Sequence, residues 1–150
     1  MKKESKKWLL VANWKMNPVH LKEANQLFTS TKKTANTLRN VETVVCPPFI
    51  FLSNLKSTGH RCVVGAQDAF FEPEGSFTGS VSYLQLKNLS IKYVILGHSE
   101  RRKQGETNEM VGQKVKSVLK GMMTPIICVG ESVRDERGSY LEFIKIQIQE

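Results

Sequence analysis

Features that would place a protein in a membrane or on a secretory route are missing from this sequence of 150 residues. No apolar run approaches the roughly 20 residues of a transmembrane helix, and the charged opening segment leads into an apolar run too short for a signal peptide. The three cysteines each lie within an apolar run and never in a CxxC spacing: Cys46, Cys62 and Cys128. This pattern argues against disulfides or a zinc site and favours buried thiols in a reduced compartment. We therefore expect a cytoplasmic protein.

Motifs that mark the common nucleotide-dependent and metal-dependent enzymes are also lacking. No glycine-rich dinucleotide fingerprint follows the first strand-like segment, and no P-loop, Ser-centred elbow or zinc motif occurs. The net charge of +8 comes from 22 basic and 14 acidic residues that are interleaved along the chain, without an aromatic-basic RNA motif. A moderately basic surface fits nucleic acid, but it would equally steer a small phosphorylated anion towards a site. Charge alone does not decide between these partners.

What the chain does contain is a series of short apolar runs that end in glycine, proline or polar residues. Continuous apolar runs of this length are typical of strands that are buried on both faces of a parallel sheet. Five such strands are predicted: Trp8–Ala12, Val41–Cys46, Cys62–Ala66, Tyr93–Leu96 and Pro125–Val129. The length of the chain suffices for one domain with its own core.

Helical patterns lie between the predicted strands. We expect the first helix to start at Pro18, because proline suits a position that needs no N–H. Its apolar stripe comprises Leu21, Ala24, Phe28, Thr31, Ala35 and Leu38. Shorter helical segments are predicted around Phe51–Leu55, over Ser82–Leu89 and from Tyr140 onward. Thr107 is expected to cap a further helix that ends at Gly121. The apolar side of that helix comprises Val111, Val115, Val118 and Leu119.

Strands and helices alternate at intervals of roughly 30 residues, as in consecutive β-α-β units. This order predicts parallel strands that are joined by helices. Two architectures fit it, a doubly wound sheet and part of a (β/α) barrel. The missing dinucleotide fingerprint disfavours one version of the first, and the sequence pattern leaves both architectures open.

The stretch Tyr93–Arg102 combines an apolar run with a sharp change to polar residues. Gly97 ends the run, and His98 and Glu100 follow at once. Residues just past the carboxyl end of a parallel strand are where α/β proteins carry their chemistry, and histidine can change charge near neutral pH. A solvated loop with an incidental ion pair would explain the same residues. The functional interpretation gains weight because the strand Trp8–Ala12 also ends in polar residues, Asn13-Trp14-Lys15-Met16-Asn17.

Together these two strand ends resemble the triosephosphate isomerase family. Four more stretches look like the family in its order and at about its spacing: Cys46-Pro47-Pro48-Phe49, Gly65-Ala66-Gln67, Gly75-Ser76-Phe77-Thr78-Gly79 and Cys128-Val129-Gly130-Glu131. The likeness covers nearly the whole chain from Trp8 onward. It implies an α/β fold, a partial TIM (β/α)8 barrel with about five parallel strands and interleaved helices.

The resemblance also implies an activity, the interconversion of dihydroxyacetone phosphate and glyceraldehyde 3-phosphate in glycolysis and gluconeogenesis. The proton would move through an enediolate, with no cofactor and no metal. His98 would donate, as a neutral imidazole, to the developing oxyanion. Lys15 would bring positive charge to the oxygens and phosphate of the substrate, Asn13 would help to bind the substrate and position Lys15, and Glu100 would pair with Lys15. Without the resemblance, these residues would pass as ordinary turn and surface residues.

The segment from Ala69 to Ser80 is rich in aromatic residues for a loop. We expect it to bury this surface, either within the chain or against a second subunit. By resemblance the complete enzyme would be a homodimer, with Phe77 and Thr78 in the interface and Thr78 reaching towards the site of the neighbouring subunit. The remaining basic residues of the strand end, Arg101 and Arg102, are expected to be structural or interface residues.

The chain departs from the family in its extent. The family's barrel has eight strands in about 250 residues, and residues 1–150 correspond to the amino-terminal portion of one such domain, with strands 6 to 8 missing. The glutamate base at the end of the sixth strand, the mobile lid and the glycine-rich phosphate turns have no counterpart. Glu131 aligns with a separate glutamate of the family and does not replace the base.

Two expectations follow from this departure. The chain alone should be inactive, and the strand edges of an open barrel should make it poorly stable or prone to self-association. An alternative function is that of a non-catalytic half-barrel that binds a phosphorylated ligand or a protein partner. Nucleic-acid binding is a more distant third possibility.

Overall fold

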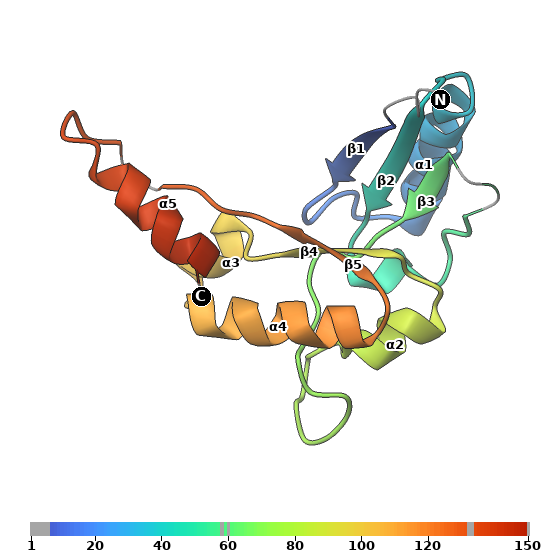
Figure 1. The fold of residues 1–150 in the computed structure, drawn as a ribbon. Coiled ribbons are helices and arrows are strands. Elements are labelled where there is room, and N and C mark those ends of the chain that lie inside the picture. The colour runs from blue at the N-terminus through green and yellow to red at the C-terminus, as the bar shows by residue number, and fades with distance from the viewer. Residues whose placement is uncertain (1–6, 58, 60, 132–133, 150) are drawn as a thin grey trace, which may run out of the picture.

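The computed structural model describes residues 7–57, 59, 61–131 and 134–149. Parallel strands alternate with helices along the chain, as the sequence pattern predicts (Figure 1). Three strands form one sheet: β1 (Trp8–Asn13), β2 (Val41–Cys46) and β3 (Cys62–Val64). Two more form a second sheet: β4 (Tyr93–Leu96) and β5 (Thr124–Ile127). The fold is therefore α/β and resembles part of a barrel, and the described strands do not close on themselves.

The two sheets are joined where the chain continues past β3. Ala66 pairs in parallel with Val94 of β4, through hydrogen bonds from its N–H to the carbonyl of Tyr93 and from Ile95 N–H to its own carbonyl, both at 2.9 Å. Gly65 makes this junction possible. A Cβ at Gly65 would lie only 2.7 Å from Cγ1 of Val44 and 3.1 Å from the carbonyl oxygen of Tyr93. The strands therefore follow one another in chain order, from β1 to β5.

Most helices lie close to their predicted places, with two corrections. The short helix predicted around Phe51–Leu55 is instead a 3-10 helix at Phe49–Phe51, and the first helix begins later than predicted. The described helical elements are α1 (Leu21–Ala35), the short 3-10 helix η1 (Phe49–Phe51), α2 (Tyr83–Asn88), α3 (Ser99–Lys103), α4 (Asn108–Lys120) and α5 (Ser139–Gln149). The predicted start of α1 at Pro18 is wrong, because His20 holds the N-cap position. At α4 the prediction is confirmed, since Thr107 caps the helix and Gly121 follows its last residue. The sequence pattern did not predict α3.

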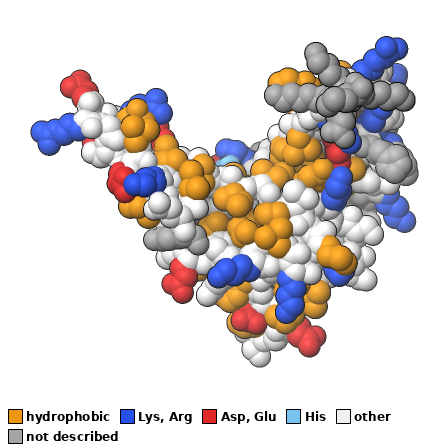
Figure 2. All heavy atoms as spheres, viewed as in Figure 1, with side chains coloured by type: hydrophobic (Ala, Val, Ile, Leu, Met, Phe, Trp, Pro, Cys, Tyr) orange, Lys and Arg blue, Asp and Glu red, His pale blue; other side chains and the backbone are white. Residues whose placement is uncertain are grey.

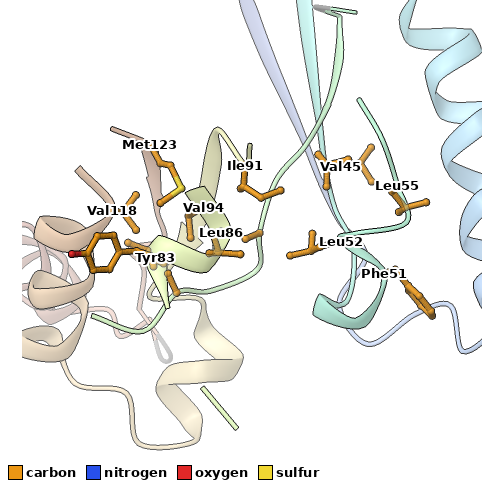
Figure 3. Packing of buried hydrophobic residues seen from close by; sticks show 14 of the residues in the cluster. Val45, Phe51, Leu52, Leu55, Tyr83, Leu86, Ile91, Val94, Val118 and Met123 are labelled. Atoms are coloured by element: carbon orange, nitrogen blue, oxygen red, sulfur yellow. The ribbon is translucent and has the colours of Figure 1, made fainter. Parts of the chain in front are cut away.

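The main hydrophobic core lies between the two sheets and the helices that cover them. Figure 3 shows Leu52, which follows η1, and Leu86 of α2 between the two halves of this core. Val45 of β2 lies on one side, with Val94 of β4 and Val118 of α4 on the other. The parallel strands thus bring residues that are far apart in the sequence into one packed cluster.

The first strand corrects a prediction. We expected Trp8–Ala12 to be buried on both faces, but Trp8 is 62% exposed and Leu10 is 53% exposed. The strand forms in the predicted place and pairs with β2 from Trp8 opposite Val41 to Asn13 opposite Cys46. In the described structure it pairs on that one side, and α1 packs mainly against β2 and β3. The apolar sequence therefore predicts the position of this strand correctly but not its burial.

One side chain of α4 differs from the prediction, and another is buried although the pattern gave no sign of it. Leu119, which we assigned to the apolar side of the helix, is exposed, whereas Val111 and Val118 are buried as expected. Lys114 is almost completely buried, although lysine is rarely buried unless it is paired. Its ammonium pairs with the carboxylates of Asp68 and Glu106.

Exposed apolar side chains continue onto the last helix. On the face drawn in Figure 2, the molecule is hollowed between α5 and the sheet that contains β1, and hydrophobic side chains gather across this face. The exposed apolar side chains of α5 include Leu141, Phe143 and Ile148. No described helix combines the length and the apolar character that a membrane crossing requires.

Candidate functional site

The candidate site joins the carboxyl ends of β1 and β4. Because the strands are parallel, both ends lie at the same rim of the open barrel. Lys15 follows β1, and Glu100 lies in the first turn of α3, just after β4. The Nζ atom of Lys15 lies 2.7 Å from Oε1 of Glu100, although 85 residues separate the two in the sequence. The fold thus brings the two predicted strand ends together.

The backbone around Lys15 is held in an uncommon conformation. Lys15 has φ of 55°, in the left-handed region that few residues other than glycine adopt. Asn13 stabilises this turn, because its Oδ1 accepts a hydrogen bond of 2.9 Å from the N–H of Lys15. On the other side, Nε2 of Gln67 donates a hydrogen bond of 2.7 Å to the Lys15 carbonyl oxygen. Both polar backbone groups of Lys15 therefore have side-chain partners.

A tight turn at the end of β4 positions α3. Gly97 has φ of 69°, and a Cβ there would lie 3.0 Å from Nη2 of Arg102 and 3.2 Å from the carbonyl oxygen of Cys128. Nε of Arg102 donates a hydrogen bond of 2.8 Å to the Gly97 carbonyl oxygen, and its Nη1 donates to Asn108. These contacts fasten α3, near its carboxyl end, to the end of β4 and to the start of α4, which fits a structural role for Arg102.

His98 is the N-cap residue of α3. Its Nδ1 accepts a hydrogen bond of 3.3 Å from the backbone N–H of Glu100. An accepting Nδ1 carries no proton, so the neutral ring that fits this contact bears its proton on Nε2. Oε2 of Glu100 is farther from Nδ1, at 3.6 Å. With Nδ1 as the acceptor of the backbone contact, Nε2–H is the donor of the ring.

The electrostatics of the pair are those of an exposed ion pair. The hydrogen bond from Lys15 is the main cause that lowers the pKa of Glu100 below its ordinary value of 4.5, and the nearby charge of Lys15 acts in the same direction. Glu100 is therefore a carboxylate at neutral pH. About half of each side chain is exposed to solvent, so a bound anion could reach the Lys15 ammonium from the solvent side.

The structure brings four of the predicted site residues into one connected group. Glu100 contacts both Lys15 and His98, and Asn13 contacts the backbone of Lys15. Their roles in binding and catalysis stay predictions. The fifth residue, Gln67, was not predicted as a site residue, although it stands directly after the third predicted strand, where the same signal of a polar strand end applied.

The two predicted interface residues lie in the aromatic loop, away from this group. The ring of Phe77 packs on that of Phe70 with centroids 4.8 Å apart, and Phe70 also contacts Phe71 at 4.4 Å. The loop therefore buries part of its aromatic surface within the chain. Phe77 and Thr78 nevertheless remain exposed, and their predicted contact with a second subunit stays a prediction.

Two further sequence predictions can be placed in the described structure. Cys46 and Cys62 are buried, Cys128 is half-buried, and all three are free thiols. Within the residues that the structure describes, His, Cys, Asp and Glu side chains do not form a group of three or more that could hold a metal ion.

Comparison with known proteins identifies relatives over almost the whole chain. A family model described as triosephosphate isomerase matches residues 8–150. The triosephosphate isomerase of Dehalococcoides mccartyi is 40% identical over 146 residues, which cover 95% of this chain and 57% of the relative. That of Thermoanaerobacter sp. is 40% identical over 149 residues, with 95% and 58% covered. That of Natranaerobius thermophilus is 41% identical over 144 residues, with 94% and 56% covered. The chain thus spans less than two thirds of the length of these curated relatives.

Proposed function

The chain belongs to the triosephosphate isomerase family, and from this premise we propose that its site serves the interconversion of dihydroxyacetone phosphate and glyceraldehyde 3-phosphate. Residues 1–150 act in this proposal as the amino-terminal portion of a single (β/α) barrel domain. The observation that carries the proposal is the contact of 2.7 Å between Lys15 Nζ and Glu100 Oε1, because it joins the two strand ends from which the family's chemistry would come.

Each residue of the group has a chemical task in this reaction. A proton moves between adjacent carbons through an enediolate, so negative charge develops on the substrate oxygens. Nε2–H of His98 would donate to that charge, and fixed donors of this kind stabilise a transition state strongly. The Lys15 ammonium would balance the phosphate and the oxygens, while Asn13 and Glu100 would hold Lys15 in place through the contacts described above.

The reaction also needs a base, and the described carboxylates near the rim suit that task poorly. Glu100 is engaged by Lys15, which lowers its pKa. A hydrogen bond from its own backbone N–H, followed by one from Arg134, lowers the pKa of Glu131. A carboxylate with a lowered pKa is a weaker general base. We therefore expect the chain by itself to bind the substrate and to isomerise it very slowly.

The assembly and location follow from the family in the same way. The complete enzyme would be a cytoplasmic homodimer whose interface includes Phe77 and Thr78. The exposure of both residues at the tip of the aromatic loop supports this arrangement. Sedimentation of the complete enzyme and of its Phe77→Ser variant would test it, and identical monomer masses at all concentrations would contradict it.

Activity is tested by joining this chain to the part of the Dehalococcoides mccartyi relative that it does not cover. We expect this chimera to isomerise dihydroxyacetone phosphate, and the change His98→Gln to lower its rate by about 100-fold or more. The matched control is His20→Gln, since the side chain of His20 makes no capping hydrogen bond. A loss below about tenfold would remove His98 from its proposed role.

The same chimera distinguishes the proposed isomerase from the alternative function, a non-catalytic half-barrel. A folded chimera that binds dihydroxyacetone phosphate through Lys15 but shows no isomerisation would favour it. Binding that is abolished by Lys15→Met and retained in Lys22→Met, a change at an exposed position of α1, would support the substrate site itself.

A further inference from the structure

Gln67 connects two strand ends through its side-chain amide. Its Nε2 donates to the carbonyl oxygen of Lys15 at 2.7 Å and to that of Cys46, at the end of β2, at 2.9 Å. Both N–H groups of one amide can be satisfied in this way. Cys46 also accepts a hydrogen bond of 3.0 Å from the N–H of Trp14. The turn that carries Lys15 is therefore held to β2 from two directions.

The next residue reaches to the other half of the site. Asp68 is 9% exposed, and its Oδ2 lies 3.1 Å from Nη2 of Arg101 in α3. Its Oδ1 lies 2.8 Å from the buried Nζ of Lys114, which also contacts Glu106. Asp68 is thus anchored in the interior and holds α3 from there. Arg101 directly follows Glu100 in that helix.

The exposed pair of Lys15 and Glu100 needs such support. A solvent-exposed ion pair contributes little and does not fix the geometry of two long side chains by itself. The left-handed conformation of Lys15 also persists only where the surrounding structure holds it. The segment after β3 meets both needs, because it contacts the backbone of Lys15 through Gln67 and contacts α3 through Asp68.

We propose that Gln67 and Asp68 are positioning residues that align Lys15 with Glu100. Gln67 fixes the backbone of Lys15, and Asp68 fixes α3 through Arg101. The consequence for ligand binding rests on the proposed function, since it assumes that the aligned pair receives a triose phosphate. The alignment itself exists without ligand and is testable separately.

The first test compares Gln67→Leu with Gln113→Leu, a matched change at an exposed position of α4. The carboxyl signal of Glu100 is followed by NMR during a pH titration of the whole chain without ligand. Because the bond from Lys15 lowers the pKa of Glu100, Gln67→Leu should raise that pKa towards the value in a Lys15→Met variant. Gln113→Leu should leave it unchanged. An unchanged titration in folded Gln67→Leu would overturn the proposal for Gln67.

The double variant Gln67→Leu/Lys15→Met separates positioning from a general structural effect. If Gln67 acts through Lys15, the double variant should titrate like Lys15→Met alone. A further shift of the same size in the double variant would show that Gln67 acts elsewhere and would contradict the proposal. Arg101→Met tests the Asp68 half, because it removes that contact and retains the buried pair of Asp68 with Lys114. It should also raise the pKa of Glu100 by more than the loss of one nearby cation does in Lys103→Met.

Binding of dihydroxyacetone phosphate is then measured on the same variants. Affinity should fall about tenfold in Gln67→Leu, because a misplaced Lys15 would lose its charged contact with the ligand. It should not change in Gln113→Leu. Failure of the unmodified chain to bind dihydroxyacetone phosphate would count against the proposed function alone. The ligand-free titrations would still decide whether Gln67 and Asp68 align the pair.

Discussion

Nζ of Lys114 lies 2.8 Å from Oδ1 of Asp68, in an interior where the lysine side chain is 1% exposed. The same ammonium contacts Glu106, which precedes the N-cap residue of α4. One buried cation of α4 therefore links the segment after β3 to the loop that precedes α4. Buried charges persist only when they are paired in this way.

Removal of this cation should be costly. In Lys114→Met the carboxylates of Asp68 and Glu106 would remain buried without their shared partner, and we expect the free energy of unfolding to fall by about 3–5 kcal/mol. Urea denaturation measures the change. Lys116→Met, at an exposed position of the same helix, is the control and should alter stability little. Equal stabilities of the two variants would contradict this account.

The junction between the two sheets should not accommodate even one methyl group at position 65 without a loss of stability. In Gly65→Ala the new Cβ would lie 2.7 Å from Val44 Cγ1 and 2.8 Å from Cys46 Sγ. Overpacking of a tight interior site costs about 1–3 kcal/mol, so the unfolding midpoint should fall clearly. Gly130→Ala serves as the control, since a Cβ there would meet no atom within 4 Å. A Gly65→Ala variant as stable as this control would show that the junction is loosely packed.

The capping hydrogen bond of α4 can be measured with a single substitution. Oγ1 of Thr107 accepts from the N–H of Met110 at 3.2 Å. Thr107→Ala removes this acceptor and should lower the free energy of unfolding by about 1 kcal/mol. Thr107→Ser retains the hydroxyl and should recover most of the loss, as judged by urea denaturation. If Ser is no better than Ala, the cap does not stabilise the helix.

A buried carboxylate at the amino ends of the strands should make stability depend on pH. Glu42 is 5% exposed and pairs with Nζ of Lys7 at 2.9 Å and Nζ of Lys92 at 3.0 Å. Burial raises its pKa, but the hydrogen bonds from both lysines prevail and hold it below the ordinary value of 4.5. A lowered pKa in the folded state contributes stability above the unfolded-state pKa, and this contribution is lost as the pH falls through the folded-state value.

The measurement compares wild type with Glu42→Gln by thermal unfolding at neutral pH and at acidic pH down to about 3. The stability difference between the two should be largest at neutral pH. It should shrink as the pH falls below about 4.5, where the unfolded chain takes up the proton first, and vanish once the pH has passed the lower pKa of Glu42 in the folded protein. Glu142→Gln, which changes an exposed pair with Lys145 at 3.5 Å, should show no such trend. A difference that stays constant with pH would exclude Glu42 as the source.

Much of the fold could be predicted because local patterns and the native environment agree. The ranges Val41–Cys46 and Tyr93–Leu96 were predicted as they are observed, since both strands lie within a sheet that is covered. The same apolar pattern wrongly predicted that Trp8 is buried. An apolar strand can be buried, but its sequence does not show whether another element packs against it. Lys114 was missed for another reason. Its acidic partners lie 46 and 8 residues away, and a sequence pattern does not reveal which distant charges meet.

The candidate site was predictable to the extent that it stands at strand ends. Asn13, Lys15 and His98 were found from their positions after apolar runs and from the family resemblance. Glu100 contacts Lys15 and His98, and Asn13 joins them through the backbone of Lys15. Gln67 also stands at a predicted strand end, but its contacts could not be predicted from the pattern. Its partners are backbone carbonyl oxygens. Every residue has such an oxygen, so the sequence does not indicate which of them Gln67 contacts.

The exposed β1 strand has a consequence for motion at the rim. Lys15 extends from the strand with the least protection, whereas His98 and Glu100 follow β4, whose residues are buried. Local opening is easiest where few apolar contacts must break, so amide hydrogens of β1 should exchange with deuterium sooner than those of β4. A ligand that contacts both strand ends would connect the less protected β1 to the buried β4. Its binding should therefore slow exchange in β1 far more than in β4.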